Sequence, residues 1–289
     1  MQQIFLSVSL DLIMVKLHVD VLDESCLLDI LSRTSEGQMA STFICNVRWE
    51  DGSVTQAFVK RFTSLDKIGI SNEITGYIIA NGCNLPIPHK VGLLQANDYC
   101  FDGHMLEHEV DDDYSEWCVV VSAAQGATPK SYYNSDIAHC KSLINLVASW
   151  DKLPDAISFD DWVANQDRNM GNLVIAGPNR IVLIDHSNLP VDLNWHPSDL
   201  IATKEFRNKL VEILDYFQHM PLPIKSKVSH ATAIHPEIYN AILDNLRHWW
   251  SVLLADEDEI YQTALEHFLA QRANLGATRV SSTYQMLVG

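Results

Sequence analysis

A polar stretch near the middle of the chain most restricts how this chain can fold. It consists of Asn165-Gln166-Asp167-Arg168-Asn169-Met170-Gly171-Asn172. Two short apolar runs follow, Leu173–Ile175 and Ile181–Ile184, and the turn residues Gly177-Pro178-Asn179 between them predict a β-hairpin. Asp185 comes directly after the second run. The pattern therefore places the polar stretch before one arm of a hairpin and a carboxylate at the end of the other.

Asp167, Asn172 and Asp185 are the side chains that transfer of a phosphoryl group from ATP would require. Such a reaction uses a carboxylate that orients the attacking hydroxyl and accepts its proton, a role that we give to Asp167. It also uses oxygen ligands for Mg²⁺, here Asn172 and Asp185. Arg168 is a second candidate catalytic residue, which either neutralises phosphate charge or pairs with a neighbouring carboxylate. Asp-x4-Asn also arises by chance in polar turns, but the hairpin and its second carboxylate favour the functional interpretation.

Lys60 and Glu73 complete the candidate site from the first part of the chain. Lys60 lies near the end of the alternating run Gln56–Phe62, which is typical of a strand. Glu73 lies in a helical pattern, Asn72–Ala80, with Ser71 as candidate N-cap. Burying an unpaired ammonium is costly, and Lys60 considered alone would be an exposed strand lysine. With Glu73 directed toward the sheet, we predict a Lys60–Glu73 pair that contacts ATP phosphates.

Strand patterns dominate the first part of the chain and helical patterns the second. The run Ser41–Trp49 and the run Gln56–Phe62 are separated by Glu50-Asp51-Gly52, which predicts a hairpin. Further strands are expected at Cys26–Ser32, Lys90–Leu94, Tyr99–Phe101 and Trp117–Val121. After the turn-rich segment 122–129, helices are expected at Ile137–Trp150, Lys204–Phe217, Pro236–Leu254 and Glu259–Asn274. We therefore expect an α+β, bilobal fold, with nucleotides binding between the lobes.

The same residues carry a resemblance to a known family. Residues 159–173 resemble the catalytic loop of HipA-like kinases, an atypical kinase group related to the phosphatidylinositol 3- and 4-kinases. Ile184-Asp185-His186 is similar to the metal-binding segment of that group, and Asn72-Glu73 with Leu85-Pro86-Ile87-Pro88 is similar to its helix and proline-rich exit. The resemblance covers roughly Cys26 to Asp192. It implies a protein-kinase-like fold, with residues 1–121 as a β-rich N-lobe and 122–289 as a helical C-lobe carrying the catalytic loop and metal site.

The resemblance also implies how ATP and Mg²⁺ would be held. Lys60 would contact the ATP phosphates, Glu73 would anchor Lys60, and residues 121–126 would form a hinge. Backbone groups of this hinge, at Ser122, Ala123 and Ala124, would bind adenine. The loop expected to cover the phosphates has a single glycine, Gly37, and so departs from a glycine-rich loop. His186-Ser187 stands where ordinary protein kinases have Phe-Gly.

The predicted function is ATP- and Mg²⁺-dependent phosphoryl transfer to a hydroxyl, with Ser or Thr of a protein as the first choice of acceptor. One alternative is a small-molecule phosphotransferase of the aminoglycoside or choline kinase type. That group usually has His two residues before the catalytic Asp, where this chain has Asn165. Another alternative is a non-catalytic pseudokinase that acts as a binding module. Because HipA is a bacterial toxin kinase, the resemblance also leaves open an antitoxin-like or regulatory protein partner.

The charge and composition of the chain narrow the remaining classes. The 289 residues carry a formal net charge of −17, a field that opposes bulk binding to nucleic acids or anionic membranes. The six cysteines are scattered without a CxxC pair, which favours reduced thiols in a cytoplasmic protein. The apolar start of the chain is interrupted by Asp11 and Lys16 and lacks a basic leader pattern. We therefore expect a soluble protein, whose natural start is either Met1 or Met14.

Overall fold

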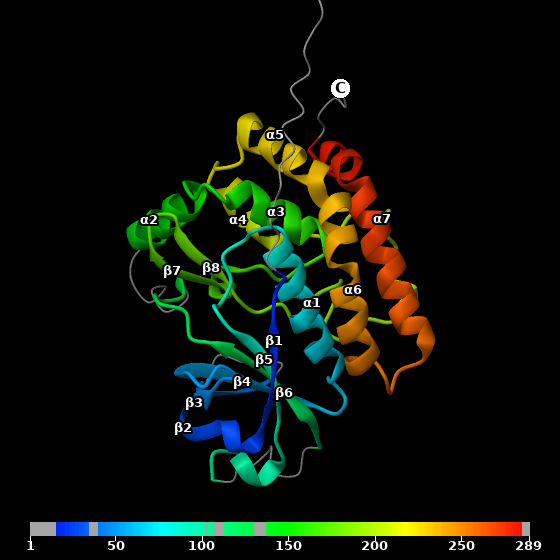
Figure 1. Ribbon diagram of the computed structural model, residues 1–289. Helices are drawn as coiled ribbons and strands as arrows, with labels where there is room; N and C mark the ends of the chain where they lie inside the picture. Colours follow the sequence, from blue (N-terminus) through cyan, green and yellow to red (C-terminus); the bar gives the residue numbers. More distant parts are fainter. Residues whose placement is uncertain (1–15, 35–39, 102, 107–112, 130–136, 285–289) are drawn as a thin grey trace, which may run out of the picture.

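The computed structural model describes residues 16–34, 40–101, 103–106, 113–129 and 137–284. Side chains are described for all of these except residues 137–139. The described chain forms two lobes, a strand-rich lobe followed by a mainly helical lobe (Figure 1). This arrangement confirms the bilobal α+β fold expected from the order of strand and helix patterns. The predicted phosphate-covering residue Gly37 lies outside the described residues.

A six-stranded sheet forms the first lobe. Its strands are β1 (Val19–Asp23), β2 (Leu27–Arg33), β3 (Ser41–Arg48), β4 (Val54–Thr63), β5 (Val91–Gln95) and β6 (Tyr114–Ser122). Their order across the sheet is β1-β5-β6-β4-β3-β2. β1 pairs with β5 in parallel, and the other neighbouring strands pair antiparallel. The expected hairpin joins β3 to β4, with Ser41 opposite Arg61 and Arg48 opposite Val54.

Alternation along β4 directs its side chains to the two faces of the sheet. Phe58 and Lys60 belong to the face that borders the second lobe, where both line a pocket. Ala57 and Val59 belong to a separate apolar cluster on the other face. The pocket and the apolar cluster therefore both depend on the register of β4. A slip by one residue would move Lys60 away from the second lobe.

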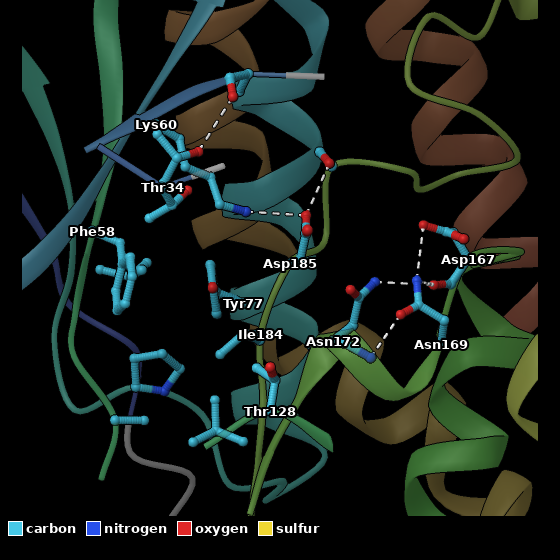
Figure 2. Close-up of a pocket in the computed structure, with 18 of the residues that line it drawn as sticks. Thr34, Phe58, Lys60, Tyr77, Thr128, Asp167, Asn169, Asn172, Ile184 and Asp185 are labelled. Carbon is cyan, nitrogen blue, oxygen red and sulfur yellow. Dashed lines mark hydrogen bonds and ion pairs between the residues drawn. The ribbon is translucent and has the colours of Figure 1, made fainter. Parts of the chain in front are cut away.

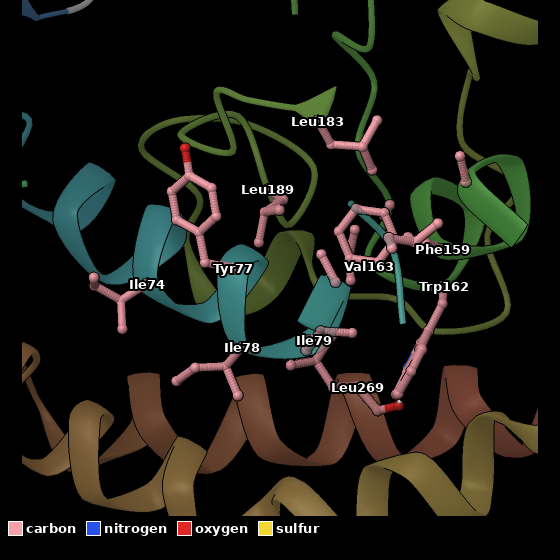
Figure 3. Packing of buried hydrophobic residues seen from close by; sticks show 14 of the residues in the cluster. Ile74, Tyr77, Ile78, Ile79, Phe159, Trp162, Val163, Leu183, Leu189 and Leu269 are labelled. Atoms are coloured by element: carbon pink, nitrogen blue, oxygen red, sulfur yellow. Dashed lines mark hydrogen bonds between the residues drawn. The ribbon is translucent and has the colours of Figure 1, made fainter. Parts of the chain in front are cut away.

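Helix α1 (Ile68–Gly82) lies between the sheet and the second lobe (Figure 1). Thirteen of its fifteen residues are buried, so it has no exposed polar face. Ile78 and Ile79 point toward the helices α6 (His235–Leu253) and α7 (Glu259–Thr283), whereas Tyr77 points to the opposite side (Figure 3). The Trp250 indole of α6 donates a hydrogen bond of 2.9 Å to Thr75 Oγ1. Contacts on several sides therefore fix the orientation of α1.

The second lobe contains one small hairpin and six α-helices among the described residues. The hairpin pairs β7 (Leu173–Gly177) with β8 (Arg180–Leu183), close to the two apolar runs that predicted it. The helices are α2 (Ile137–Ala148), α3 (Leu153–Trp162), α4 (Lys209–Tyr216), α5 (Leu222–Ala231), α6 and α7. The indole of Trp162 at the end of α3 donates to the Leu269 carbonyl of α7 at 2.9 Å (Figure 3). No helix in the described ranges is long and apolar enough to cross a membrane.

Several predicted element boundaries are wrong, each for a physical reason. α1 begins at Ile68, and Ser71 is a buried helical residue rather than its N-cap, because the apolar residues before it also pack inward. Residues 98–101 form a 3₁₀ helix instead of a strand, which allows Phe101 to pack on Phe43 with the ring centres 5.0 Å apart. α4 begins at Lys209 rather than Lys204. α3 and α5 were not predicted as separate helices.

Candidate active site

A pocket of about 490 Å³ lies between the sheet and the second lobe. In Figure 2, Phe58 and Lys60 from the sheet and Thr34, directly after β2, lie on one side of it, and Asn172, Asp185 and Asp167 from the second lobe lie on the other. The apolar part of the lining is formed by Phe58, Val121, Val174 and Ile184. One pocket therefore combines an apolar region with the charged residues that the sequence singled out. Its volume lies within the usual range for small-molecule sites.

Lys60 forms an ion pair with each of two carboxylates. Its Nζ atom contacts Glu73 Oε1 of α1 and lies 3.0 Å from Oδ1 of Asp185, which follows β8. The Glu73 side chain is fully buried, and the Lys60 side chain is 13% exposed. Glu73 Oε2 also accepts a hydrogen bond of 2.9 Å from the His186 backbone N–H. Glu73 thus ties strand β4 to the segment that carries Asp185.

Lys60 and Asp185 both stay ionised in their ion pair despite partial burial. Burial alone would lower the pKa of Lys60, but the carboxylates of Asp185 and Glu73 raise that pKa above its usual value. Desolvation would likewise raise the pKa of Asp185, but the Lys60 ammonium and the Ser187 hydroxyl hold it well below its usual range. Ser187 Oγ donates to Asp185 Oδ1 at 3.0 Å. An ionised Asp185 is the form that binds a cation.

The backbone at Asp185 is unusual, since its φ of +61° lies in the left-handed region. A non-glycine residue there costs energy and persists only where the surroundings hold it. Asn72 of α1 provides part of this support by donating to the carbonyls of Ser187, at 2.8 Å, and of Leu193, at 2.9 Å. Gly76 of α1 leaves room for His186, whose Cβ atom would lie 2.4 Å from a Cβ added at Gly76. Helix α1 therefore positions both Lys60 and Asp185.

The segment that carries Asp167 begins directly after α3. Ala164 adopts a left-handed conformation, with a φ of +52°, and turns the chain out of the helix. Asn165 is buried, donates to Asp160 Oδ1 at 3.0 Å, and accepts from the Asp167 backbone N–H at 3.0 Å. The position that holds His in the rival small-molecule kinases is thus a structural amide here. It directs the Asp167 side chain toward the pocket, which Asp167 lines.

Arg168 points away from the pocket and into the core of the second lobe. Its guanidinium is fully buried and forms an ion pair with the buried carboxylate of Asp160 at 3.2 Å. It also donates to the Ile184 carbonyl at 2.7 Å and to His186 Nδ1 at 3.1 Å. The structure therefore gives Arg168 the carboxylate-pairing role, in which it positions the segments around Asn172 and Asp185, and Arg168 is not among the residues that line the pocket.

Asn172 lies at the end of a short 3₁₀ helix, Met170–Asn172, immediately before β7. Its Nδ2 donates to the Asp167 carbonyl at 2.9 Å, and the residue lines the pocket (Figure 2). Since the amide nitrogen is used within the loop, the amide oxygen is the group left for a ligand. The Ile184 N–H donates to the Asn172 carbonyl at 3.1 Å, which keeps the two candidate metal ligands close together, Asn172 just before β7 and Asp185 just after β8.

The predicted hinge residues differ in what they offer the pocket. Ser122 and Ala124 line it, but the backbone N–H of Ala123 donates to the Gln56 carbonyl at 2.9 Å and Ala123 is not among the lining residues. The Ser122 N–H is also used, since it donates to the Lys90 carbonyl at 2.9 Å. The backbone of Ala124 and the carbonyl of Ser122 are therefore the hinge groups that remain for a ligand.

Sequence reasoning missed several residues that line the pocket or contact its acids. Phe58 follows from strand alternation once Lys60 is placed, because the two lie two residues apart in β4. Lys209 could not be found in this way. Its Nζ donates to Asp167 Oδ1 at 2.7 Å from 42 residues further along the chain. No local pattern in the sequence connects the two.

The fold and pocket define a bilobal, kinase-like protein. In the comparison with solved structures, the crystal structure of a Helicobacter pylori proinflammatory kinase, CtkA, matches with a TM-score of 0.50 and 12% identity. The match covers 91% of this chain and 99% of that chain, and at this identity it shows the fold alone. No protein-family model matches this sequence. No curated protein matches it either. The kinase-like fold is therefore confirmed, and membership of the HipA-like family stays a prediction.

Proposed function

We propose that this protein is an ATP- and Mg²⁺-dependent phosphotransferase that transfers the γ-phosphoryl group of ATP to a hydroxyl. The observation that carries the proposal is the meeting of Lys60, Asp185 and Asp167 in one pocket between the lobes. These residues come from β4, from the segment after β8 and from the segment after α3. The kinase-like fold, shared with a protein described as a kinase, supports the same class of reaction.

The pocket suits ATP in its shape and chemistry. Phe58 and Val121 of the sheet and Val174 and Ile184 of the second lobe supply apolar contacts for an adenine ring. The Ser122 carbonyl and the Ala124 backbone would hydrogen-bond its edge. Lys60 supplies the positive charge for the phosphates and, through Glu73 and Asp185, is already held in place before they arrive. A group fixed in advance loses little conformational entropy when the ligand binds.

The candidate metal ligands suit Mg²⁺. Asp185 offers an ionised carboxylate and Asn172 an amide oxygen, and hard oxygen ligands of this kind are those that Mg²⁺ prefers. A Mg²⁺ ion held by these two side chains and the phosphates would neutralise charge on the phosphate oxygens. Lys60 and Mg²⁺ would then share the Asp185 carboxylate, which explains why this acid is the one that both sides of the site require.

Asp167 is the group that receives the proton of the acceptor. Its side chain is 38% exposed, at the edge of the pocket. Asn165 accepts a hydrogen bond from the Asp167 backbone N–H, and Lys209 donates one to the Asp167 carboxylate. Because the Asp167 carboxylate is open to solvent, a hydroxyl group on a second protein, such as a Ser or Thr side chain, could reach it from outside the pocket. We therefore propose a protein hydroxyl as the acceptor and treat a small molecule as the competing outcome.

Labelling of a cell lysate tests both parts of the proposal. Wild-type protein and the Asp167→Ala variant are each incubated with lysate, Mg²⁺ and γ-labelled ATP, after the variant is shown to unfold at a similar temperature. We expect labelled protein bands that require wild-type Asp167. Label found only in small molecules would refute the protein acceptor while keeping the phosphotransferase. The absence of any label that depends on Asp167 would refute the phosphotransferase and favour a pseudokinase.

A further inference from the structure

Lys209 makes a direct contact with the proposed proton acceptor. Its Nζ donates to Asp167 Oδ1 at 2.7 Å, and the two side chains are 36% and 38% exposed. Lys209 is the first residue of α4, and Asn208 caps that helix by accepting from the Val211 N–H at 3.1 Å. The ammonium therefore lies beside the Asp167 carboxylate, which lines the pocket, although Lys209 itself is not among the lining residues.

Two other cations described near the pocket have carboxylate partners of their own, away from Asp167. Lys60 is bound to Glu73 and Asp185. Arg168, the only cationic residue in the sequence between Asp167 and Asn172, is fully buried and paired with Asp160. The phosphoryl group carries negative charge as it moves from ATP toward the acceptor, and cations placed along that path stabilise the transition state. Among the described residues, Lys209 is the cationic side chain that contacts the Asp167 carboxylate.

The position of Lys209 is built into the fold. The segment before it crosses Arg272 of α7, whose fully buried guanidinium donates to the carbonyls of Ala202 at 3.1 Å and Lys204 at 3.0 Å. These bonds tie the segment before α4 to α7, and the helix begins at Lys209 after the Asn208 cap. The start of α4 is thus held by α7 at one point and by the Asn208 cap at another.

We propose that Lys209 is a catalytic residue that contacts the transferring phosphoryl group at the acceptor end of its path. This inference rests on the proposed phosphotransferase function. In the step, the acceptor oxygen forms a bond to the γ-phosphorus. The bond from that phosphorus to the bridging β–γ oxygen breaks, and its electron pair leaves with ADP. The acceptor proton passes to the Asp167 carboxylate, and Lys209 stays protonated throughout.

A purely structural role for Lys209 predicts a different result. Ion pairs that are this exposed contribute little to stability. Loss of the Lys209 ammonium should therefore leave the unfolding temperature nearly unchanged, while a catalytic role lowers kcat. Arg207 offers a matched control, because it pairs with Glu212 at the start of the same helix and both side chains are exposed. The partner of Arg207 is therefore Glu212, whereas the partner of Lys209 is the pocket residue Asp167.

The test compares wild type with Lys209→Met, Lys209→Arg and Arg207→Met. Steady-state ADP release is measured with MgATP as substrate and water as acceptor, and MgATP binding is measured separately by titration. We expect Lys209→Met to lower kcat about 100-fold, the size of effect seen when one transition-state donor is lost. The dissociation constant for MgATP should stay within about twofold, Lys209→Arg should recover part of kcat, and Arg207→Met should match wild type.

Three results would overturn the inference. If wild type turns over MgATP and Lys209→Met has the same kcat, Lys209 takes no part in transfer although the phosphotransferase function stands. If Lys209→Met and Arg207→Met lower kcat equally, the effect is general to the start of α4. A wild-type protein that shows no turnover at all, and no difference from Asp185→Asn, would overturn the proposed function and this inference with it.

Discussion

The Nζ atom of Lys60 lies 3.0 Å from Oδ1 of Asp185, although 125 residues separate the two along the chain. Lys60 belongs to the sheet and Asp185 to the helical lobe, so this ion pair spans the boundary between the lobes. Glu73 contacts the same ammonium from helix α1. The two halves of the candidate site are therefore joined before any nucleotide is present, and the consequences can be measured.

Substitution of Lys60 by Met should destabilise the protein as well as abolish nucleotide turnover. Glu73 is fully buried and would lose its cation, a change that costs about 3–5 kcal/mol of unfolding free energy. Burial raises the pKa of Glu73, so protonation of the unpaired Glu73 carboxyl should stabilise the folded variant. A carboxyl with a raised folded-state pKa stabilises most at low pH, and the contribution is lost as pH rises through that pKa.

Urea unfolding of Lys60→Met at pH 5 and pH 8 measures this effect. The variant should gain stability relative to wild type at the lower pH. Lys209→Met serves as the control, because its partner Asp167 is 38% exposed and the loss should stay below about 1 kcal/mol. Equal stability losses for the two variants would contradict the buried Lys60–Glu73 pair.

Arg168 should prove a positioning residue. Arg168→Met leaves the buried Asp160 carboxylate without its cation, and we expect a loss of about 3–5 kcal/mol. Lys152→Met is the comparison, since Lys152 pairs with Asp155 on the same helix with both side chains about one-third exposed. Thermal unfolding of the two variants decides the matter. A stable Arg168→Met protein with normal MgATP binding but no transfer would instead assign Arg168 to the chemistry.

Gly126 should tolerate no side chain. Its φ of +126° is strained for other residues, and an added Cβ would lie 2.5 Å from the Ile175 carbonyl oxygen of β7. Ala127 and Ile175 exchange backbone hydrogen bonds of 3.1 and 2.9 Å, which hold the hinge against β7. The clash at Gly126 would push the hinge away from β7 and break these bonds. We expect Gly126→Ala to weaken MgATP binding at least about 10-fold, which corresponds to about 1.4 kcal/mol.

Gly52→Ala is the matched control for Gly126→Ala. Gly52 also has a positive φ, of +80°, but nothing lies within 4 Å of an added Cβ. This variant should pay the backbone strain alone and bind MgATP like wild type. Comparable binding losses in the two alanine variants would show that contact with β7 is unimportant.

His235 should make stability depend on pH away from the pocket. Burial lowers the pKa of His235 to about 4, and its ring stacks on Trp162 at 4.6 Å. An imidazole whose folded-state pKa is depressed destabilises the fold as pH falls below about 6.5, because the unfolded state binds the proton more readily. Between pH 7 and pH 5 this amounts to about 2 kcal/mol.

A His235→Gln variant isolates that contribution. The drop in unfolding free energy from pH 7 to pH 5 should be about 2 kcal/mol smaller in the variant than in wild type, whatever its stability at pH 7. Urea titrations at several pH values measure the slope. Parallel pH profiles for the two proteins would contradict a buried, neutral His235.

Local patterns in the sequence anticipated the parts of the site that lie on regular elements. Strand alternation placed Lys60, helical spacing directed Glu73 toward it, and the contact between the two is present. The hairpin after Asn172 was visible for the same reason. Both strands and helices repeat with a fixed period, so a side chain's direction follows from its place in the pattern.

The remaining features depend on contacts between distant segments, which no local pattern encodes. Lys209 contacts Asp167 from 42 residues further along the chain, and Arg272 of α7 holds the segment before α4 through the carbonyls of residues 202 and 204. The burial of Arg168 follows from Asp160 on the preceding helix, in a direction that the Asp-x4-Asn pattern leaves open. The acceptor is not encoded in any contact within the chain.

Transfer of γ-labelled phosphate by wild type and by Asp185→Asn tests the central claim most directly. Asparagine keeps the size of the side chain and leaves Lys60 paired with Glu73, so the fold should survive, as thermal unfolding can verify. It removes the charge that would bind Mg²⁺ and should lower MgATP turnover by about 1,000-fold or more, the scale of a lost catalytic group. Equal turnover by the two folded proteins would contradict the assignment of this site as a phosphotransferase centre.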